Sequence, residues 1–309
     1  MPLPLRITAT PLLETGLVIA WSSGFIGGTL ASMTSSIFLV LFWRFFLAAL
    51  VLIPLALPQL RRMKPRDMGL HGVIGGFAMF GYLATMIAAI DLGVPPGTAA
   101  LIAALQPLAT AALSGTVLGE RVFLRQWVGL AVGFVGVSIS VAGGLDQAPL
   151  GGYGLALVSM ACIVAATLIA KAKAGATPLL PALTVQCAVS ATLFLPLAAL
   201  DGGLLPDMTP AFGYAVLWFI MFSTLAAYGL YWANLARTST TRVSSLIYLT
   251  PPVTTVWAFM MFGEPITLSI VAGFLVSLAG VWLARTSPSD KTIACEESTE
   301  EVAEVSCDF

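Results

Sequence analysis

The feature that most constrains the fold is a series of apolar runs, each about as long as a bilayer is thick. In the first half of the chain they cover about 11–31, 36–57, 68–92, 94–118 and 126–144. In the second half they cover about 151–170, 178–200, 211–236, 239–262 and 266–284. A helix satisfies its own backbone hydrogen bonds in lipid and crosses the bilayer with about 20 apolar residues. With 58% hydrophobic and only 9% charged residues, the sequence predicts an all-α integral membrane protein of ten transmembrane helices.

Positive charge is distributed unevenly between the loops that join these runs. With a cytoplasmic N-terminus, alternate loops hold all of the 14 Lys and Arg residues except one, namely Arg6, Arg61, Arg62, Lys64, Arg66, Arg121, Arg125, Lys171, Lys173, Arg237, Arg242, Arg285 and Lys291. Loops rich in Lys and Arg stay on the cytoplasmic side of a membrane protein. We therefore expect both termini to lie in the cytoplasm.

An internal repeat relates the two halves of the chain. Residues 106–136 align without gaps with residues 250–280, at a constant offset that places Pro107 on Pro251. Each copy comprises five helices, an odd number, so the two copies must face opposite ways across the membrane. Inverted repeats of this kind are typical of alternating-access transporters, which bind substrate near the midplane between the repeats.

The chain accordingly divides into four segments. These are a cytoplasmic N-terminus (1–10), a first five-helix repeat (11–145), an inverted second repeat (146–285) and an acidic cytoplasmic tail (286–309). The tail holds seven acidic residues and few apolar ones, so we expect it to be disordered.

Several motifs carry a family resemblance. They are Trp21-Ser22-Ser23-Gly24-Phe25, Arg44-Phe45, the repeat-matched prolines, and the Gly-Glu pairs 119–120 and 263–264, each followed by a Gly-rich helix. With these motifs the chain resembles the EamA-type repeats of the drug/metabolite transporter superfamily. The resemblance implies a multi-pass protein of the bacterial inner membrane that exports or exchanges small metabolites. A narrower resemblance is to the YddG-type exporters of aromatic amino acids, although no short motif fixes the substrate.

Aromatic, sulfur-containing and polar residues at helical spacing are candidates for substrate binding. They are Trp21, Phe25, Met79, Tyr82, Met86, Gln106, Tyr228, Trp232, Ser244, Ser245 and Tyr248. Aromatic walls with polar tips suit an amino-acid side chain, and flexible Met suits tolerance among substrates. The same stripes also occur in ordinary helix packing, and small hydroxyls also join membrane helices.

The matched prolines are candidates for gate hinges. Pro107 and Pro251 lie near the middle of the fourth and ninth predicted helices, where proline removes a backbone hydrogen bond and kinks a helix. Glu120 and Glu264, at the ends of the same helices, are expected to cap neighbouring helices or hold loops.

Three ionisable residues are candidates for a charge or proton role. Arg44 is the one basic residue deep within a predicted span and should face the bundle interior or a water-filled cavity. It could attract an anion or serve a structural role. His71 lies near the cytoplasmic start of the third span and could titrate near neutral pH. Glu14, near the start of the first span, could couple transport to protons, as resemblance to small multidrug exporters of the superfamily implies.

The favoured function is export of small metabolites, most of all amino acids and among them aromatic ones, with multidrug or organic-cation export as the alternative. Phosphorylated substrates would need several cavity Lys or Arg residues, and only Arg44 is available. A channel or an intramembrane enzyme are further alternatives; an enzyme would need a nucleophile and base or a metal cluster, which the spans lack. The expected partners are a small-molecule substrate and the lipid bilayer, with no cofactor, metal or nucleic acid. The protein could act as a monomer.

Overall fold

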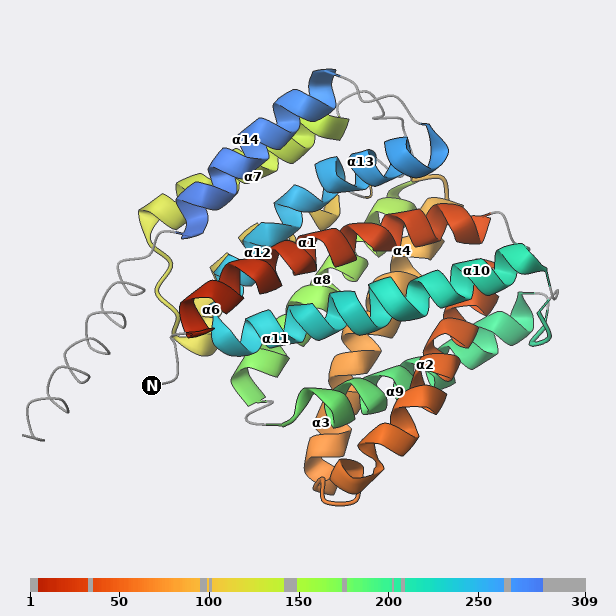
Figure 1. Cartoon of the computed structure of the whole chain (residues 1–309). Helices are drawn as coiled ribbons and strands as arrows, with labels where there is room; N and C mark the ends of the chain where they lie inside the picture. Colours follow the sequence, from red (N-terminus) through yellow and green to blue (C-terminus); the bar gives the residue numbers. More distant parts are fainter. Residues whose placement is uncertain are drawn as a thin grey trace, which may run out of the picture.

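A computed structural model of the chain describes residues 5–32, 36–94, 99, 102–141, 149–173, 177–201, 203–206, 209–263 and 268–285, and every regular element in these ranges is helical (Figure 1). The first half contains α1 (Leu5–Ser32), α2 (Ile37–Leu60), α3 (Pro65–Gly75), η1 (Gly76–Gly81), α4 (Tyr82–Asp91), α6 (Gln106–Leu118) and α7 (Leu124–Val141). The second half contains α8 (Leu150–Lys173), α9 (Leu179–Leu200), α10 (Pro210–Trp218), η2 (Phe219–Tyr228), α11 (Gly229–Arg237), α12 (Thr240–Ser245), η3 (Leu246–Leu249), α13 (Thr250–Phe262) and α14 (Leu268–Arg285).

Six continuous helical segments in the described residues are long and apolar enough to cross a membrane. They are 37–60, 65–91, 150–173, 179–200, 210–237 and 240–261, and shorter apolar stretches lie in α7 and α14. Several predicted runs agree with the observed helices to within a few residues, for example 36–57 with α2 and 178–200 with α9, whereas α1 begins six residues before run 11–31 and α6 covers only the second half of run 94–118. The total of ten spans stays a prediction, and the acidic tail 286–309 lies outside the described residues.

Two long segments are not regular α-helices throughout. The segment from α3 to α4 contains the π-helical stretch η1, and the segment from α10 to α11 contains the π-helical stretch η2. A π turn accommodates an extra residue and is found at functional sites in many proteins. Both stretches lie halfway along their segments and bring side chains to the same region of the bundle.

The sequence repeat corresponds to equivalent helices. Helices α6 and α13, and likewise α7 and α14, have bounds that differ by the same offset as the sequence repeat. Gly119 and Gly263 end α6 and α13 in the left-handed conformation, with φ of 70° and 72°. A residue with a Cβ rarely adopts this conformation, so a matched glycine serves both helix ends.

Helices α7 and α14 pack against one another through small residues and lie side by side along one edge of the bundle (Figure 1). A Cβ added to Gly129 would lie 2.7 Å from the carbonyl oxygen of Gly280. The Ser277 hydroxyl donates to the Gly133 carbonyl at 3.4 Å. Small side chains let membrane helices approach closely, so packing rather than charge joins the last helix of each repeat.

Candidate functional site

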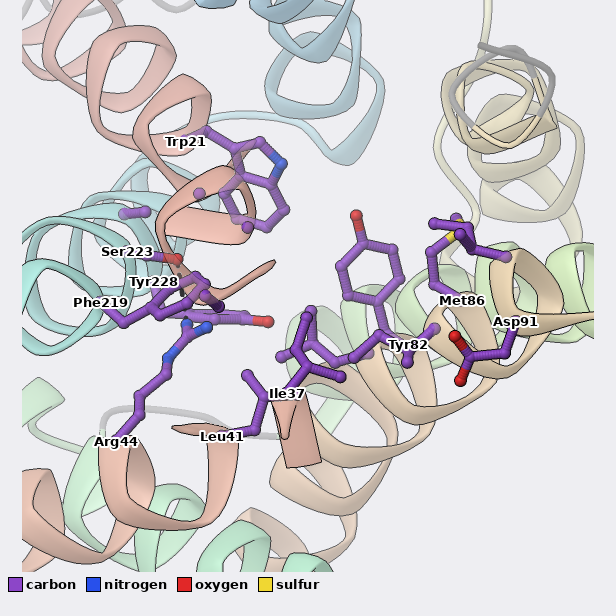
Figure 2. Close-up of a pocket in the computed structure, with 17 residues that line it drawn as sticks. Trp21, Ile37, Leu41, Arg44, Tyr82, Met86, Asp91, Phe219, Ser223 and Tyr228 are labelled. Carbon is purple, nitrogen blue, oxygen red and sulfur yellow. Dashed lines mark hydrogen bonds between the residues drawn. The ribbon is translucent and has the colours of Figure 1, made fainter. Parts of the chain in front are cut away.

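A cavity of about 630 Å³ opens between α1, α2, α4 and η2 (Figure 2). It is lined by Trp21, Gly24, Gly28, Ala31, Ile37, Leu41, Arg44, Tyr82, Leu83, Met86, Ile87, Ile90, Asp91, Phe219, Ser223, Ala227 and Tyr228. The lining is predominantly apolar and aromatic, with few polar groups. A cavity of this size suits one small organic molecule.

Arg44 lines this cavity and is 1% exposed. Its Nε donates to Thr224 Oγ1 at 2.7 Å, and its Nη2 donates to Ser223 Oγ at 3.0 Å. The guanidinium carbon also lies 4.6 Å from the ring centroids of Phe45 and Phe219. Among the described residues no carboxylate lies within ion-pair distance of Arg44. The ion pair in this part of the chain joins Glu14 to Arg242. Two hydroxyls and two aromatic faces thus hold the guanidinium, and its charge is not neutralised.

Aromatic side chains form the walls around Arg44. Trp21 of α1 and Tyr228 of η2 lie with ring centroids 5.4 Å apart. The Tyr228 hydroxyl donates to the carbonyl of Ala78 at 2.8 Å, inside η1, so one π-helical stretch fixes a side chain of the other. Figure 2 shows Tyr82 between Trp21 and Met86, with its hydroxyl directed toward the open space.

An acidic rim borders the cavity at the end of α4. Asp91 lines the cavity there, and Figure 2 shows it on the side opposite Arg44. Asp201, at the end of α9, accepts a hydrogen bond from the Ser36 hydroxyl at 2.7 Å. Asp91 was not among the residues predicted from the sequence, although its position one helix length after Tyr82 was the signal that could have identified it.

The structure brings together only some of the predicted binding residues. Trp21, Tyr82, Met86 and Tyr228 line the cavity, as does Arg44, and the side chain of Phe25 lies outside the described residues. The others, which are Met79, Gln106, Trp232, Ser244, Ser245 and Tyr248, are buried away from it. Phe219 and Ser223, which line the cavity from η2, were not predicted. Phe219 and Ser223 lie four residues apart, and the same spacing continues to Ala227, so helical periodicity was the signal that could have identified them.

Two of the predicted residues, Trp232 and His71, contact the same side chain, Gln186. Trp232 donates through Nε1 to Gln186 Oε1 at 2.9 Å, and Gln186 Nε2 lies 3.4 Å from His71 Nδ1. His71 therefore contacts neighbouring helices and does not line the cavity. Its proton role stays a prediction.

Both matched prolines lie in the first turn of a regular α-helix, where a different backbone conformation ends. Pro107 follows a turn at 104–105 and Pro251 follows the 3₁₀ stretch η3. Pro251 lies within the continuous helical segment 240–261, at the point where the 3₁₀ stretch changes to α-helix, and the role of both prolines as gate hinges stays a prediction. Because Pro251 has no backbone N–H, it cannot donate to the carbonyl of Ile247, four residues earlier. The Thr250 hydroxyl donates to this carbonyl instead, at 2.7 Å.

The acidic residues near the first and fourth helices contact one short segment. Glu14, 2% exposed, pairs with Arg242 through Oε1 and Nε at 2.7 Å. Glu120 Oε2 accepts from the Thr240 hydroxyl at 2.7 Å, at the first residue of α12, while Ser239 is the N-cap of that helix. Glu264 lies outside the described residues. Among the described side chains, His, Cys, Asp and Glu form no group of three that could hold a metal ion.

Comparison with known proteins gives a consistent result. The sequence pattern of the EamA-like transporter family matches residues 12–142 and 150–286, one match for each half. A probable amino-acid metabolite efflux pump of Salmonella typhimurium is 28% identical over 217 residues, covering 66% of this chain and 72% of the pump. A probable terminal-alkyne amino-acid exporter of Streptantibioticus cattleyicolor is 30% identical over 237 residues, covering 72% of this chain and 75% of the exporter. A solved structure described only as the crystal structure of a protein shares the fold, with a TM-score of 0.75 at 22% identity over 91% of this chain and 97% of that one.

Proposed function

This chain belongs to the EamA-like transporter family, and we propose that it exports amino acids, aromatic ones among them, across the bacterial inner membrane. The observation that carries the proposal is the buried guanidinium of Arg44 on the wall of an otherwise apolar cavity. The relatives named as amino-acid efflux pumps and exporters support the same substrate class.

The charge of Arg44 favours a substrate that carries a carboxylate. An unpaired cation in a medium of low dielectric constant strongly attracts an anion, and a guanidinium matches the planar geometry of a carboxylate. Hydrogen bonds from Arg44 to Ser223 and Thr224 fix the orientation of the guanidinium before substrate arrives. This reduces the entropy lost on binding.

The walls favour a flat or apolar side chain on that substrate. Trp21, Tyr82 and Tyr228 offer aromatic faces, and Met86 offers an adaptable apolar contact. Asp91, on the side opposite Arg44, provides a negative group for the substrate ammonium. An amino-acid zwitterion thus has a complementary group for each of its parts.

Transport is proposed to occur by alternating access between two inverted five-helix repeats, ten spans in all. The equal offsets of α6 and α13 and of α7 and α14 support the repeat. The basic loops support cytoplasmic termini, which would place the cavity mouth on the outer side because it lies among the end of α1, the start of α2 and the end of α4. The conformation described is then open outward and closed to the cytoplasm.

Counterflow in proteoliposomes tests the proposed function. Vesicles loaded with one unlabelled amino acid should accumulate a labelled one from a panel, with aromatic members preferred. Accumulation of organic cations but of no amino acid would contradict the proposal and favour multidrug export. Flux that persists without saturation would instead indicate a channel.

A further inference from the structure

The described residues contain a second buried polar group, on the far side of the cavity floor. Tyr231 of α11 lies beneath Trp21, with ring centroids 5.1 Å apart. Its hydroxyl lies 2.6 Å from Thr167 Oγ1 and accepts from Gln106 Nε2 at 3.4 Å. Ser244 of α12 is also buried, and α12 contacts α6, α8 and α11. With Thr110, one turn beyond Gln106 on α6, these residues form what we call the Tyr231 cluster.

The Tyr231 cluster is buried yet incompletely satisfied. Thr110 and Ser244 are 0% exposed, and their hydroxyls have no hydrogen-bond partner among the described residues. Buried polar groups normally have a partner, because desolvation without one is unfavourable. Hydroxyls that serve only helix packing would bond a backbone carbonyl, as Thr167 does with Ile163. Unused hydroxyls in a closed cluster indicate that their partner is present in another conformation.

The cluster is closed on its other side by contacts to a single short segment, the junction of α11 and α12. Glu14 of α1 pairs with Arg242, and Glu120 accepts from Thr240. Lys171 Nζ donates to the carbonyls of Leu235 and Thr238 at 2.9 and 2.7 Å. We refer to the Glu14–Arg242 and Glu120–Thr240 contacts as the latch, since each joins the first half of the chain to the second.

The order of these layers along the bundle defines a path. Beyond the cavity lie the aromatic floor of Trp21 and Tyr231, then the polar cluster, and then the latch near the ends of α8 and α11. The residues of the cluster come from α6, α8, α11 and α12, so parts of both repeats would have to separate to expose it. The latch contacts are the ones that such a separation would break.

We propose that the Tyr231 cluster is a cytoplasm-facing loading site, which opens when the latch breaks and binds the ammonium and carboxylate groups of an amino acid before it reaches Arg44. The proposal rests on the proposed function and orientation. Neutral hydroxyl and amide groups both donate and accept hydrogen bonds, so the cluster can serve both ends of a zwitterion. It holds no full charge, and substrate would pass to the stronger site at Arg44.

Thiol accessibility tests the opening of the cluster without any substrate. The four cysteines of the chain are replaced by alanine, and Thr110→Cys is introduced as the probe. A charged, membrane-impermeant thiol reagent should modify this residue from the cytoplasmic face only. Arg242→Gln should accelerate modification about tenfold, because breaking the latch shifts the population toward the open state. The matched control is Ala56→Cys, which is also 0% exposed but lies in α2 away from the cluster and should not react.

The result that would overturn the proposal is a Thr110→Cys residue that stays unmodified from the cytoplasmic face even with Arg242→Gln, in protein whose melting temperature shows that it is folded. Modification from the outer face alone would overturn it equally.

Transport kinetics provide a second, separate test. Thr110→Val removes a hydroxyl and keeps the shape, so KM for amino acid presented at the cytoplasmic face should rise about tenfold, as expected for the loss of one hydrogen bond to a charged group. KM at the outer face should stay the same. Equal changes at both faces would overturn the proposal. If wild-type vesicles transport no amino acid, the proposed function fails, while the thiol experiment still decides whether the cluster opens.

Discussion

At the scale of single residues, Arg44 is the group on which the proposed substrate recognition depends most. A buried cation held by two hydroxyls and two aromatic rings is an expensive arrangement for stability alone, because desolvation of the charge is not offset by a counter-ion among the described residues. Two roles were open from the sequence, an anion site and a structural arginine. The position of Arg44 on a cavity wall favours the first role.

Stability measurements separate these roles. Arg44→Met should leave the melting temperature in detergent unchanged or raise it, because removing the charge also removes its desolvation penalty. Arg62→Met, at an exposed position, is the control and should have no effect. A fall of roughly 10 °C in the Arg44 variant would correspond to about 3 kcal/mol and would assign Arg44 a structural role.

The sequence could predict part of the site at this scale. Trp21, Tyr82 and Tyr228 were identified from aromatic spacing, and all three line the cavity. Met79, in the π-helical stretch η1, and Trp232, in α11, were grouped with them by helical spacing, and neither lines the cavity. Nothing in a single sequence marks where a helix adopts a π turn, since the tertiary contacts of its neighbours decide it.

At the scale of elements, the α7–α14 pair is held by close backbone contact. A Cβ at Gly280 would lie 2.6 Å from the Gly129 carbonyl oxygen. Gly280→Ala should therefore lower the free energy of unfolding by about 1–3 kcal/mol through overpacking. Thermal denaturation of the purified protein measures the change. Gly154→Ala in α8, where an added Cβ meets nothing within 4 Å, should be neutral or slightly stabilising. Equal effects of the two substitutions would contradict this account of the interface.

The break before α13 leads to a prediction about rates. Pro251→Ala restores a backbone N–H to the first turn, so η3 and α13 can merge into one continuous helix. We expect substrate affinity to be kept and the maximal rate of counterflow to fall about tenfold, as for a hinge that sets a conformational step. Pro196→Ala, inside α9 and away from the junction of η3 and α13, is the control. An unchanged rate in the Pro251 variant would remove it as a gate residue.

At the scale of the whole molecule, the latch concerns whether transport is coupled to the movement of protons. Glu14 is the one carboxylate that is buried among the described residues, and it pairs with Arg242. This contact joins the two halves of the chain, which favours a structural role of Glu14 over proton transfer. Counterflow should therefore be independent of an imposed pH gradient, and Glu14→Gln should still exchange substrate. A gradient-driven flux that Glu14→Gln abolishes would show proton coupling through this residue.

The helices and their repeat were easier to predict from the sequence than the arrangement of the cavity and the Tyr231 cluster. Apolar runs and the offset between Pro107 and Pro251 indicated the helices and their repeat, because helix length and repeat spacing are local properties of the chain. The separation of Trp21 and Tyr228 from Ser244 and Gln106 into two layers could not be predicted. It depends on how α6, α11 and α12 pack around one another.

The most direct test of the central claim is a binding measurement with a matched pair of ligands, tryptophan and tryptamine, which differ only in the carboxylate. Wild-type protein should bind tryptophan at least about tenfold more tightly, as expected for a charge-assisted hydrogen bond. Arg44→Met should lose this preference while it keeps the weaker affinity for tryptamine. Equal affinity of the wild type for the two ligands, or a preference that survives in Arg44→Met, would contradict the account.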